Sequence, residues 1–100
     1  MPRAPGTKRD GKPFDDATIE AVWAKGTPEG KLPGFRKDKC GASMQRSKYG
    51  KTQAFGWAID HVVPVARGGS DDLSNLQPLQ WENNRHKGDD SPKWECKVVK

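Results

Sequence analysis

Hydrophobic residues spaced three and four positions apart predict a helix near the start of the chain. Ile19, Val22 and Trp23 would share one face of this helix. The pair Asp15-Asp16 supplies an N-cap and a favourable charge for the first turn, and Gly26 is placed to end it. We expect the apolar face to pack into the core.

A β-hairpin is predicted in the second half of the chain. Apolar and polar residues alternate in Phe55–Val65, and β-branched valines lie near the end of this segment, which favours a strand. Pro64 favours an end of the strand at this point. Residues 68–72, Gly-Gly-Ser-Asp-Asp, are typical of a turn, and Leu76–Leu79 is suited to pair back as a second strand. The connection between the strands is long.

A second helix is predicted directly after this hairpin. Residues 80–87 fit about two helical turns, and Gly88 is placed to end them. Trp57 and Trp81 are expected to be the main core aromatics. The elements predict an α+β fold, in which a small single domain (residues 14–100) has a strand-loop-strand-helix core at residues 57–89 and an additional N-terminal helix.

The remaining segments give few structural signals. Residues 1–13 carry four basic side chains among proline and glycine, without apolar periodicity, which predicts a flexible basic arm. Residues 27–35 are rich in proline and glycine and are predicted to be a loop. Residues 36–51 carry six basic side chains and only one acidic one, and we predict no regular element there.

The charge of the chain favours a polyanionic partner. Eighteen lysines and arginines against 13 acidic residues give a formal net charge of +5. Residues 1–54 hold 12 basic and 6 acidic side chains, whereas residues 55–100 hold 6 and 7, so the first half is the expected electrostatic footprint. No apolar run reaches the roughly 20 residues of a membrane span, so we expect a soluble, cytoplasmic protein without a membrane partner.

The two cysteines, Cys40 and Cys96, are too few for a disulfide framework and form no CxxC pair. Reduced, buried thiols are the expectation, and an incidental bridge is the alternative if the two residues lie close in space.

Candidate chemistry begins with the adjacent residues Asp60 and His61. Neighbours on a strand point to opposite faces, so both serve one site only where the strand ends or twists. Asn84, on the following helix, adds a neutral oxygen donor to the carboxylate of Asp60, and this pair of hard ligands suits Mg²⁺. Asn75 is predicted to stabilise a turn through backbone hydrogen bonds.

Four stretches of the second half stand in an order typical of one nuclease family. They are Ile59–Pro64, Gly68-Gly69, Asn75-Leu76 and Asn84–Asp89. In this order they resemble the HNH (ββα-metal) endonucleases, in which two strands and a helix clasp one metal ion. The resemblance spans residues 57–89, and Arg36–Ala42 also resembles the segment that precedes the motif in many bacterial HNH proteins.

The resemblance implies a role for each motif residue. His61 corresponds to the general base and Asp60 to the carboxylate metal ligand. Asn75 corresponds to the structural asparagine that ties the loop and steadies the base, and Asn84 to the last metal ligand, so the chain is an H-N-N variant. One divalent cation is implied, with Mg²⁺ expected and Mn²⁺ or another transition metal able to substitute.

Many HNH proteins also bind a structural zinc through two CxxC pairs. The matching positions here are Lys37, Cys40, Gln80 and Asn83, so only one thiolate remains and we expect no structural zinc.

Basic residues in or near the motif are candidates for nucleic-acid contact. They are Arg67, Arg85 and Lys87 beside the motif, and Arg36, Lys37, Lys39, Arg46 and Lys48 upstream. Each is equally well explained as an ordinary solvated cation.

The resemblance predicts an endonuclease that hydrolyses DNA phosphodiester bonds, nicking double-stranded DNA to leave 3′-hydroxyl and 5′-phosphate ends. Whether the protein acts as a homodimer stays open. One alternative is a non-catalytic DNA-binding module on the same scaffold. Another is an interaction protein whose basic arm contacts RNA or a nucleoprotein assembly.

Overall fold

The computed structural model describes residues 6–88 and 94–99. The elements in chain order are α1 (Asp16–Trp23), β1 (Thr27–Pro28), β2 (Phe35–Lys37), β3 (Ser43–Gln45), β4 (Trp57–His61), β5 (Leu76–Gln80) and α2 (Trp81–Lys87). Short 3-10 turns lie at Arg46–Lys48, Val65–Arg67 and Leu73–Asn75. Residues 1–5 of the predicted arm, and Asp89 of the motif, lie outside the described residues.

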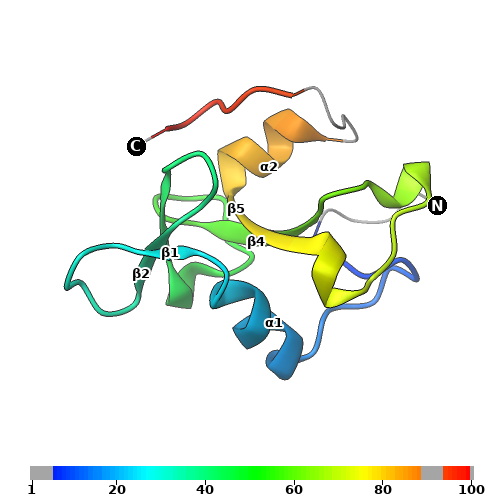
Figure 1. The fold of residues 1–100 in the computed structure, drawn as a ribbon, viewed down its shortest axis with the longest axis horizontal. Coiled ribbons are helices and arrows are strands. Elements are labelled where there is room, and N and C mark those ends of the chain that lie inside the picture. Colours follow the sequence, from blue (N-terminus) through cyan, green and yellow to red (C-terminus); the bar gives the residue numbers. More distant parts are fainter. Residues whose placement is uncertain (1–5, 89–93, 100) are drawn as a thin grey trace.

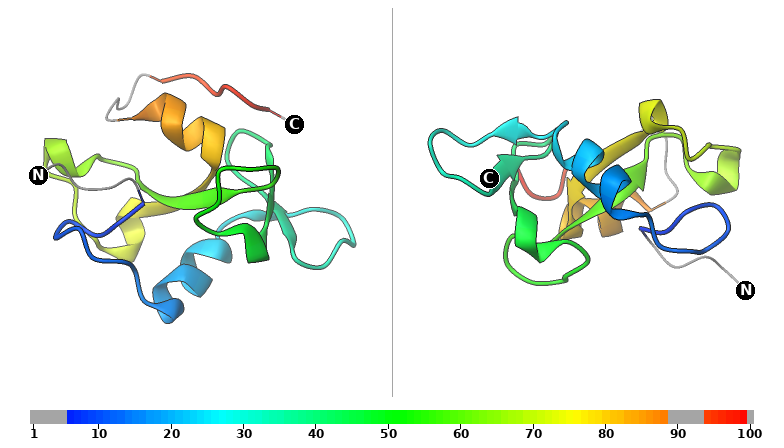
Figure 2. Two further views of the ribbon diagram at one scale, coloured as in Figure 1. Left: turned by 180° about the vertical axis from the view of Figure 1, so that it is seen from behind. Right: turned by 90° about the horizontal axis from the view of Figure 1, so that it is seen from below.

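The predicted hairpin and its two flanking helices are confirmed. β4 and β5 pair antiparallel, from Trp57 opposite Gln80 to His61 opposite Leu76. The two helices lie on opposite sides of this hairpin, α1 below and α2 above in Figure 1, and the same arrangement is seen from behind in Figure 2. The molecule is therefore the small α+β domain that the sequence predicts.

The core lies between α1 and the hairpin. Asp15 caps α1, because its carboxylate accepts a 2.8 Å hydrogen bond from the amide of Thr18. The buried cluster consists of Phe14, Ile19, Val22, Trp23, Met44, Trp57, Ile59 and Leu76. Trp57 is a core aromatic, as expected. The prediction that Trp81 is also a core aromatic is wrong, because Trp81 is half-buried and lines a cleft.

A three-stranded antiparallel sheet occupies the region predicted to lack regular elements. Its order is β1-β2-β3, with Phe35 opposite Gln45 and Lys37 opposite Ser43. These strands are two or three residues long and largely polar. Strands of this kind are defined mainly by backbone pairing, so their side chains show no regular alternation from which they could be predicted.

The carboxylate of Asp38, in the turn after β2, connects three parts of the chain. Its Oδ1 accepts hydrogen bonds from the amides of Cys40 (2.9 Å) and Ala42 (3.0 Å). Its Oδ2 accepts from the amide of Gln80 (2.9 Å) and the side-chain amide of Asn83 (3.0 Å). Only 4% of Asp38 is exposed, so these four donors replace its hydration.

The C-terminal segment is attached to α2 at the same place. The side-chain oxygen Oδ1 of Asn83 accepts hydrogen bonds from the backbone amides of Lys97 (2.8 Å) and Val98 (2.7 Å). A disulfide joins Cys40 to Cys96. The expectation of reduced thiols is thus wrong, because the C-terminal segment returns across α2 (Figure 1) and brings together two cysteines 56 residues apart.

Within residues 6–88 and 94–99, no helix has the length and apolar character needed to cross a membrane.

Asp38→Ala should lower the free energy of unfolding by about 3 kcal/mol or more, because it leaves several buried amide donors without an acceptor. Chemical denaturation followed by tryptophan fluorescence measures the change. Asp72→Ala is the matched control, since Asp72 is exposed, and its effect should stay within about 0.5 kcal/mol. Equal stability of the two variants would contradict the role of Asp38.

Candidate active site

A cleft of about 420 Å³ lies along β4, beside α2. Asp60 and His61 line it from β4, and Asn84 lines it from α2. The three residues to which the sequence assigns the metal and the proton transfer therefore line one cleft. β4 ends at His61, and the two adjacent side chains have different partners: Asp60 contacts α2, whereas His61 contacts Phe14 and Asp71.

Asp60 is a buried carboxylate, with only 6% of the residue exposed. Its Oδ2 accepts a 2.8 Å hydrogen bond from the side-chain amide of Gln77, which stands directly opposite on β5. Its Oδ1 lies 3.3 Å from the ammonium nitrogen of Lys87. Burial raises the pKa of Asp60, and the contacts with Gln77 and Lys87 oppose that rise.

Lys87 lies beneath the cleft, with 1% of the residue exposed. Its ammonium donates a 3.1 Å hydrogen bond to the backbone carbonyl of His61, besides its contact with Asp60. The sequence assigned Lys87 to phosphate contact, but a side chain buried in this way has no surface to offer DNA. It is a structural counter-charge for Asp60 and fixes the end of β4 against α2.

His61 is held on two sides, with 4% of the residue exposed. Its ring lies against Phe14, with 5.9 Å between the ring centroids. Its Nε2 lies 2.8 Å from Oδ1 of Asp71, which the loop between β4 and β5 supplies. Burial acts to raise the pKa of Asp71, but hydrogen bonds from His61 and the Arg9 amide outweigh it and lower this pKa overall.

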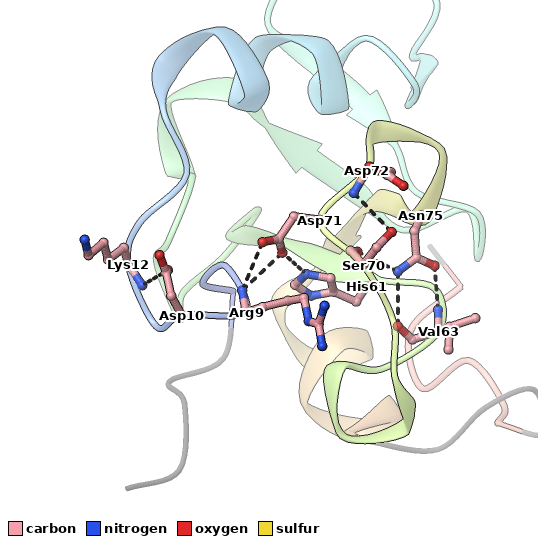
Figure 3. A network of polar contacts seen from close by, with 9 residues as sticks. All are labelled: Arg9, Asp10, Lys12, His61, Val63, Ser70, Asp71, Asp72 and Asn75. Atoms are coloured by element: carbon pink, nitrogen blue, oxygen red, sulfur yellow. Dashed lines mark hydrogen bonds and ion pairs between the residues drawn. The ribbon is translucent and has the colours of Figure 1, made fainter.

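Asn75 ties the loop that carries Asp71, as Figure 3 shows. Its Oδ1 accepts from the amide of Val63 (2.9 Å), and its Nδ2 donates to the carbonyls of Val63 (3.2 Å) and Ser70 (2.9 Å). Asn75 is not among the residues that line the cleft. Its contacts are those that the sequence assigns to a structural asparagine, one that supports the base from the loop.

The loop closes so tightly that position 69 has no room for a side chain. A Cβ on Gly69 would lie 1.7 Å from the carbonyl oxygen of Val63 and 3.0 Å from Nδ2 of Asn75. The two glycines of the motif, Gly68 and Gly69, thus have different structural roles. Gly68 adopts a φ of +90° with open space around it, whereas Gly69 allows close backbone approach.

Several basic residues predicted to contact nucleic acid have intramolecular partners. Arg36 donates to the carbonyl of Gly26 (2.7 Å) just after α1, and Arg46 pairs with Glu20. The cation of Lys39 lies 5.4 Å from the Trp94 ring centroid.

Other predicted contact residues lie in different settings. The Arg85 guanidinium lies 4.9 Å from the Trp81 ring centroid and lines the cleft. Arg67 is exposed, whereas Lys37 on β2 and Lys48 are half-buried.

Three residues near the site were missed by the sequence analysis. Asp71 belongs to a Gly-Gly-Ser-Asp-Asp stretch that is explained as a turn by composition alone. Gln77 could have been found from the hairpin register, because it stands opposite Asp60. Lys51 lines the cleft together with Thr52, and only its place in the basic stretch hinted at this.

The family model for the HNH endonuclease matches residues 40–90, and the chain belongs to this family. Searches of curated proteins and of solved structures found no match. The fold and the order of motif residues are thus those of a nuclease domain. The family points to nuclease activity on DNA, and HNH nucleases generally use a divalent metal ion.

The donors in the cleft fit such an ion. Asp60 offers a carboxylate and Asn84 an amide oxygen, both hard ligands on the wall of one cleft. Within the described ranges, no group of three or more His, Cys, Asp or Glu side chains is placed to hold a metal. An ion bound by two protein oxygens would keep positions for water and phosphate, which Mg²⁺ favours.

Lys87→Met should destabilise the metal-free protein by about 3–5 kcal/mol at neutral pH, because it leaves the buried Asp60 carboxylate without its counter-charge. Urea denaturation in chelator measures this loss. Arg85→Met, which removes an exposed cation from the same helix, should cost no more than about 1 kcal/mol. A Lys87→Met protein as stable as the wild type would rule out the counter-charge role.

Gly69→Ala should cost about 3 kcal/mol, because the methyl group would displace the backbone at Val63 and disturb Asn75. Gly68→Ala serves as the control: it meets no neighbouring atom and should cost only about 1 kcal/mol for its left-handed backbone. Thermal unfolding of both variants tests whether Gly69→Ala is less stable than Gly68→Ala. The reverse order would show that the loop is not closed at Gly69.

Proposed function

We propose that this protein is a DNA endonuclease that hydrolyses phosphodiester bonds with one divalent cation, nicking one strand of double-stranded DNA at a time. The observation that carries the proposal is that Asp60, His61 and Asn84 line one cleft, with His61 hydrogen-bonded to a carboxylate. Mg²⁺ is the proposed ion, and Mn²⁺ is expected to substitute.

His61 acts in this proposal as the general base. A neutral imidazole takes a proton from water, and the resulting nucleophile attacks the phosphorus in line with the leaving 3′ oxygen. Asp60 and Asn84 would hold the cation, which supplies charge stabilisation at the phosphate oxygens when bound. The products are then a 3′-hydroxyl and a 5′-phosphate. The single histidine among the residues that line the cleft supports one cut per binding event.

The DNA backbone is proposed to lie along the mouth of the cleft. Lys51 and Arg85 line this cleft, and both are exposed, so they are placed to contact phosphates on either side of the bond that is cut. The remaining predicted contacts are Arg36, Lys37, Lys39, Arg46, Lys48 and Arg67. The net charge of +5 supports an affinity that falls steeply with salt.

A non-catalytic DNA-binding module is the second candidate, because the basic surface by itself explains binding. Incubation with supercoiled plasmid and Mg²⁺, Mn²⁺ or chelator separates the two. The nuclease converts the plasmid to nicked circles only when metal is present. Binding without conversion under any of the metals would overturn the proposed activity.

His61→Ala should lower the single-turnover rate of nicking by about 10²- to 10⁴-fold, while DNA affinity in calcium stays near that of the wild type. Asp60→Ala and Asn84→Ala should also weaken metal binding, so a metal titration should partly rescue Asn84→Ala but not His61→Ala. His86→Ala is the matched control, because this exposed histidine lies outside the cleft lining. Wild-type nicking rates from His61→Ala would contradict the assignment of His61 as the general base.

A further inference from the structure

Within the described residues, the ring nitrogen of His61 that contacts a protein group is Nε2, and its partner is a carboxylate. Oδ1 of Asp71 lies 2.8 Å away, with 3% of the His61 side chain and 30% of the Asp71 side chain exposed. Figure 3 shows the Asp71 side chain between this ring and the N-terminal segment. Asp71 therefore has neighbours on two sides.

The second neighbour is the backbone of the N-terminal segment. The amide of Arg9 donates to both carboxylate oxygens of Asp71, at 3.1 and 3.2 Å. Arg9 occupies the second position of a turn closed by the hydrogen bond from the Gly11 amide to the Lys8 carbonyl (2.8 Å). The Lys12 amide is bound by the Asp10 carboxylate (2.9 Å), which further orders the turn. This part of the predicted flexible arm is folded against the site.

A carboxylate acceptor determines which ring nitrogen carries the proton. An ionised carboxylate only accepts hydrogen bonds, so the contact with Asp71 requires a proton on Nε2. In the neutral imidazole, Nδ1 then holds the lone pair. A ring with the opposite tautomer would direct its lone pair at the carboxylate and would have no basic atom left for water.

We propose that Asp71 is the positioning residue for the general base: it selects the Nε2–H tautomer of His61, and the Arg9 amide holds Asp71 in place. This inference rests on the proposed function in assigning His61 as the base. When His61 takes a proton at Nδ1, the carboxylate faces the resulting imidazolium and stabilises it. The N–H at Nε2 keeps its proton throughout.

Asp71→Asn tests the tautomer directly. The amide oxygen of the new side chain is needed by the Arg9 N–H, so its NH₂ group faces His61 and favours a lone pair on Nε2. Nitrogen-15 NMR of the metal-free protein should show Nε2 protonated in the wild type and Nδ1 protonated in Asp71→Asn. The single-turnover rate should fall at least about tenfold, with DNA affinity in calcium unchanged.

Two further variants keep the test independent of folding. Asp71→Glu retains the carboxylate, and it should keep the wild-type tautomer and recover most of the rate. Asp72→Asn changes the adjacent exposed aspartate and should leave tautomer and rate unchanged. A wild-type tautomer or a wild-type rate in Asp71→Asn would overturn the inference.

The contribution of the N-terminal segment is tested at Arg9. Arg9→Pro removes the amide hydrogen, and proline suits the second position of such a turn. Arg9→Ala removes the same charge but keeps the amide. The proline variant should be slower than the alanine variant by about 3- to 10-fold, the size of one hydrogen bond, at equal DNA affinity. Equal rates would overturn the role of the Arg9 amide.

The two levels of the proposal fail differently. Wild-type nicking by His61→Ala would overturn the general base and with it the positioning role of Asp71. An inactive His61→Ala together with an unchanged tautomer in Asp71→Asn would overturn the Asp71 inference alone.

Discussion

The four hydrogen bonds accepted by the buried Asp38 carboxylate are the constraint on which the arrangement of the site depends. They join the turn after β2 to the end of β5, at Gln80, and to the first turn of α2, at Asn83. Asn84, the proposed metal ligand, is the next residue along α2. The direction in which α2 leaves β5 is therefore set by a group that lies outside the cleft.

This hydrogen-bonded centre lies where many HNH proteins carry a structural zinc. By resemblance, the zinc positions correspond to Lys37, Cys40, Gln80 and Asn83. Here Gln80 and Asn83 bind Asp38, and Cys40 forms a disulfide with Cys96. A metal knuckle joins two segments through four ligand bonds, whereas this chain joins them through a carboxylate that binds the Gln80 backbone amide and the Asn83 side-chain amide, and through one covalent bridge. A domain of 100 residues has a small core, and such a connection compensates for it.

The sequence predicted the elements whose side chains alternate or repeat regularly. The helix around Ile19 and Val22 and the strand around Ile59 contact the core, and burial of their apolar residues produces the pattern. The second helix buries Asn83 and Lys87 instead, and its glycine stop at Gly88 is what the sequence shows. β1, β2 and β3 escaped prediction because backbone pairing holds them and they bury few side chains. From the sequence a disulfide was only the alternative to free thiols, because its closure depends on the path of the C-terminal segment over α2.

The motif predicted which residues gather at the cleft but not what holds them. Asp60 and His61 are defined by family order, so their positions follow from the sequence. Their partners Gln77, Lys87 and Asp71 are defined by register and loop geometry. Lys87 shows the difference: by sequence it is one more cation in a basic helix end, and only the packing of α2 on β4 turns it inward.

Asp60 and His61 have different partners because neighbouring residues on a strand point in opposite directions. Asp60 faces α2 and is held by Gln77 and Lys87, whereas His61 is held by Phe14 and Asp71 from the N-terminal side. The proposed metal ligand and the proposed base are thus supported by different parts of the chain, although they are adjacent in sequence. A disturbance of α2 should therefore act first on the cation, and a disturbance of the N-terminal segment first on the proton transfer. The hydrogen bond from Lys87 to the His61 carbonyl links the two supports, and it acts on the backbone and not on the ring.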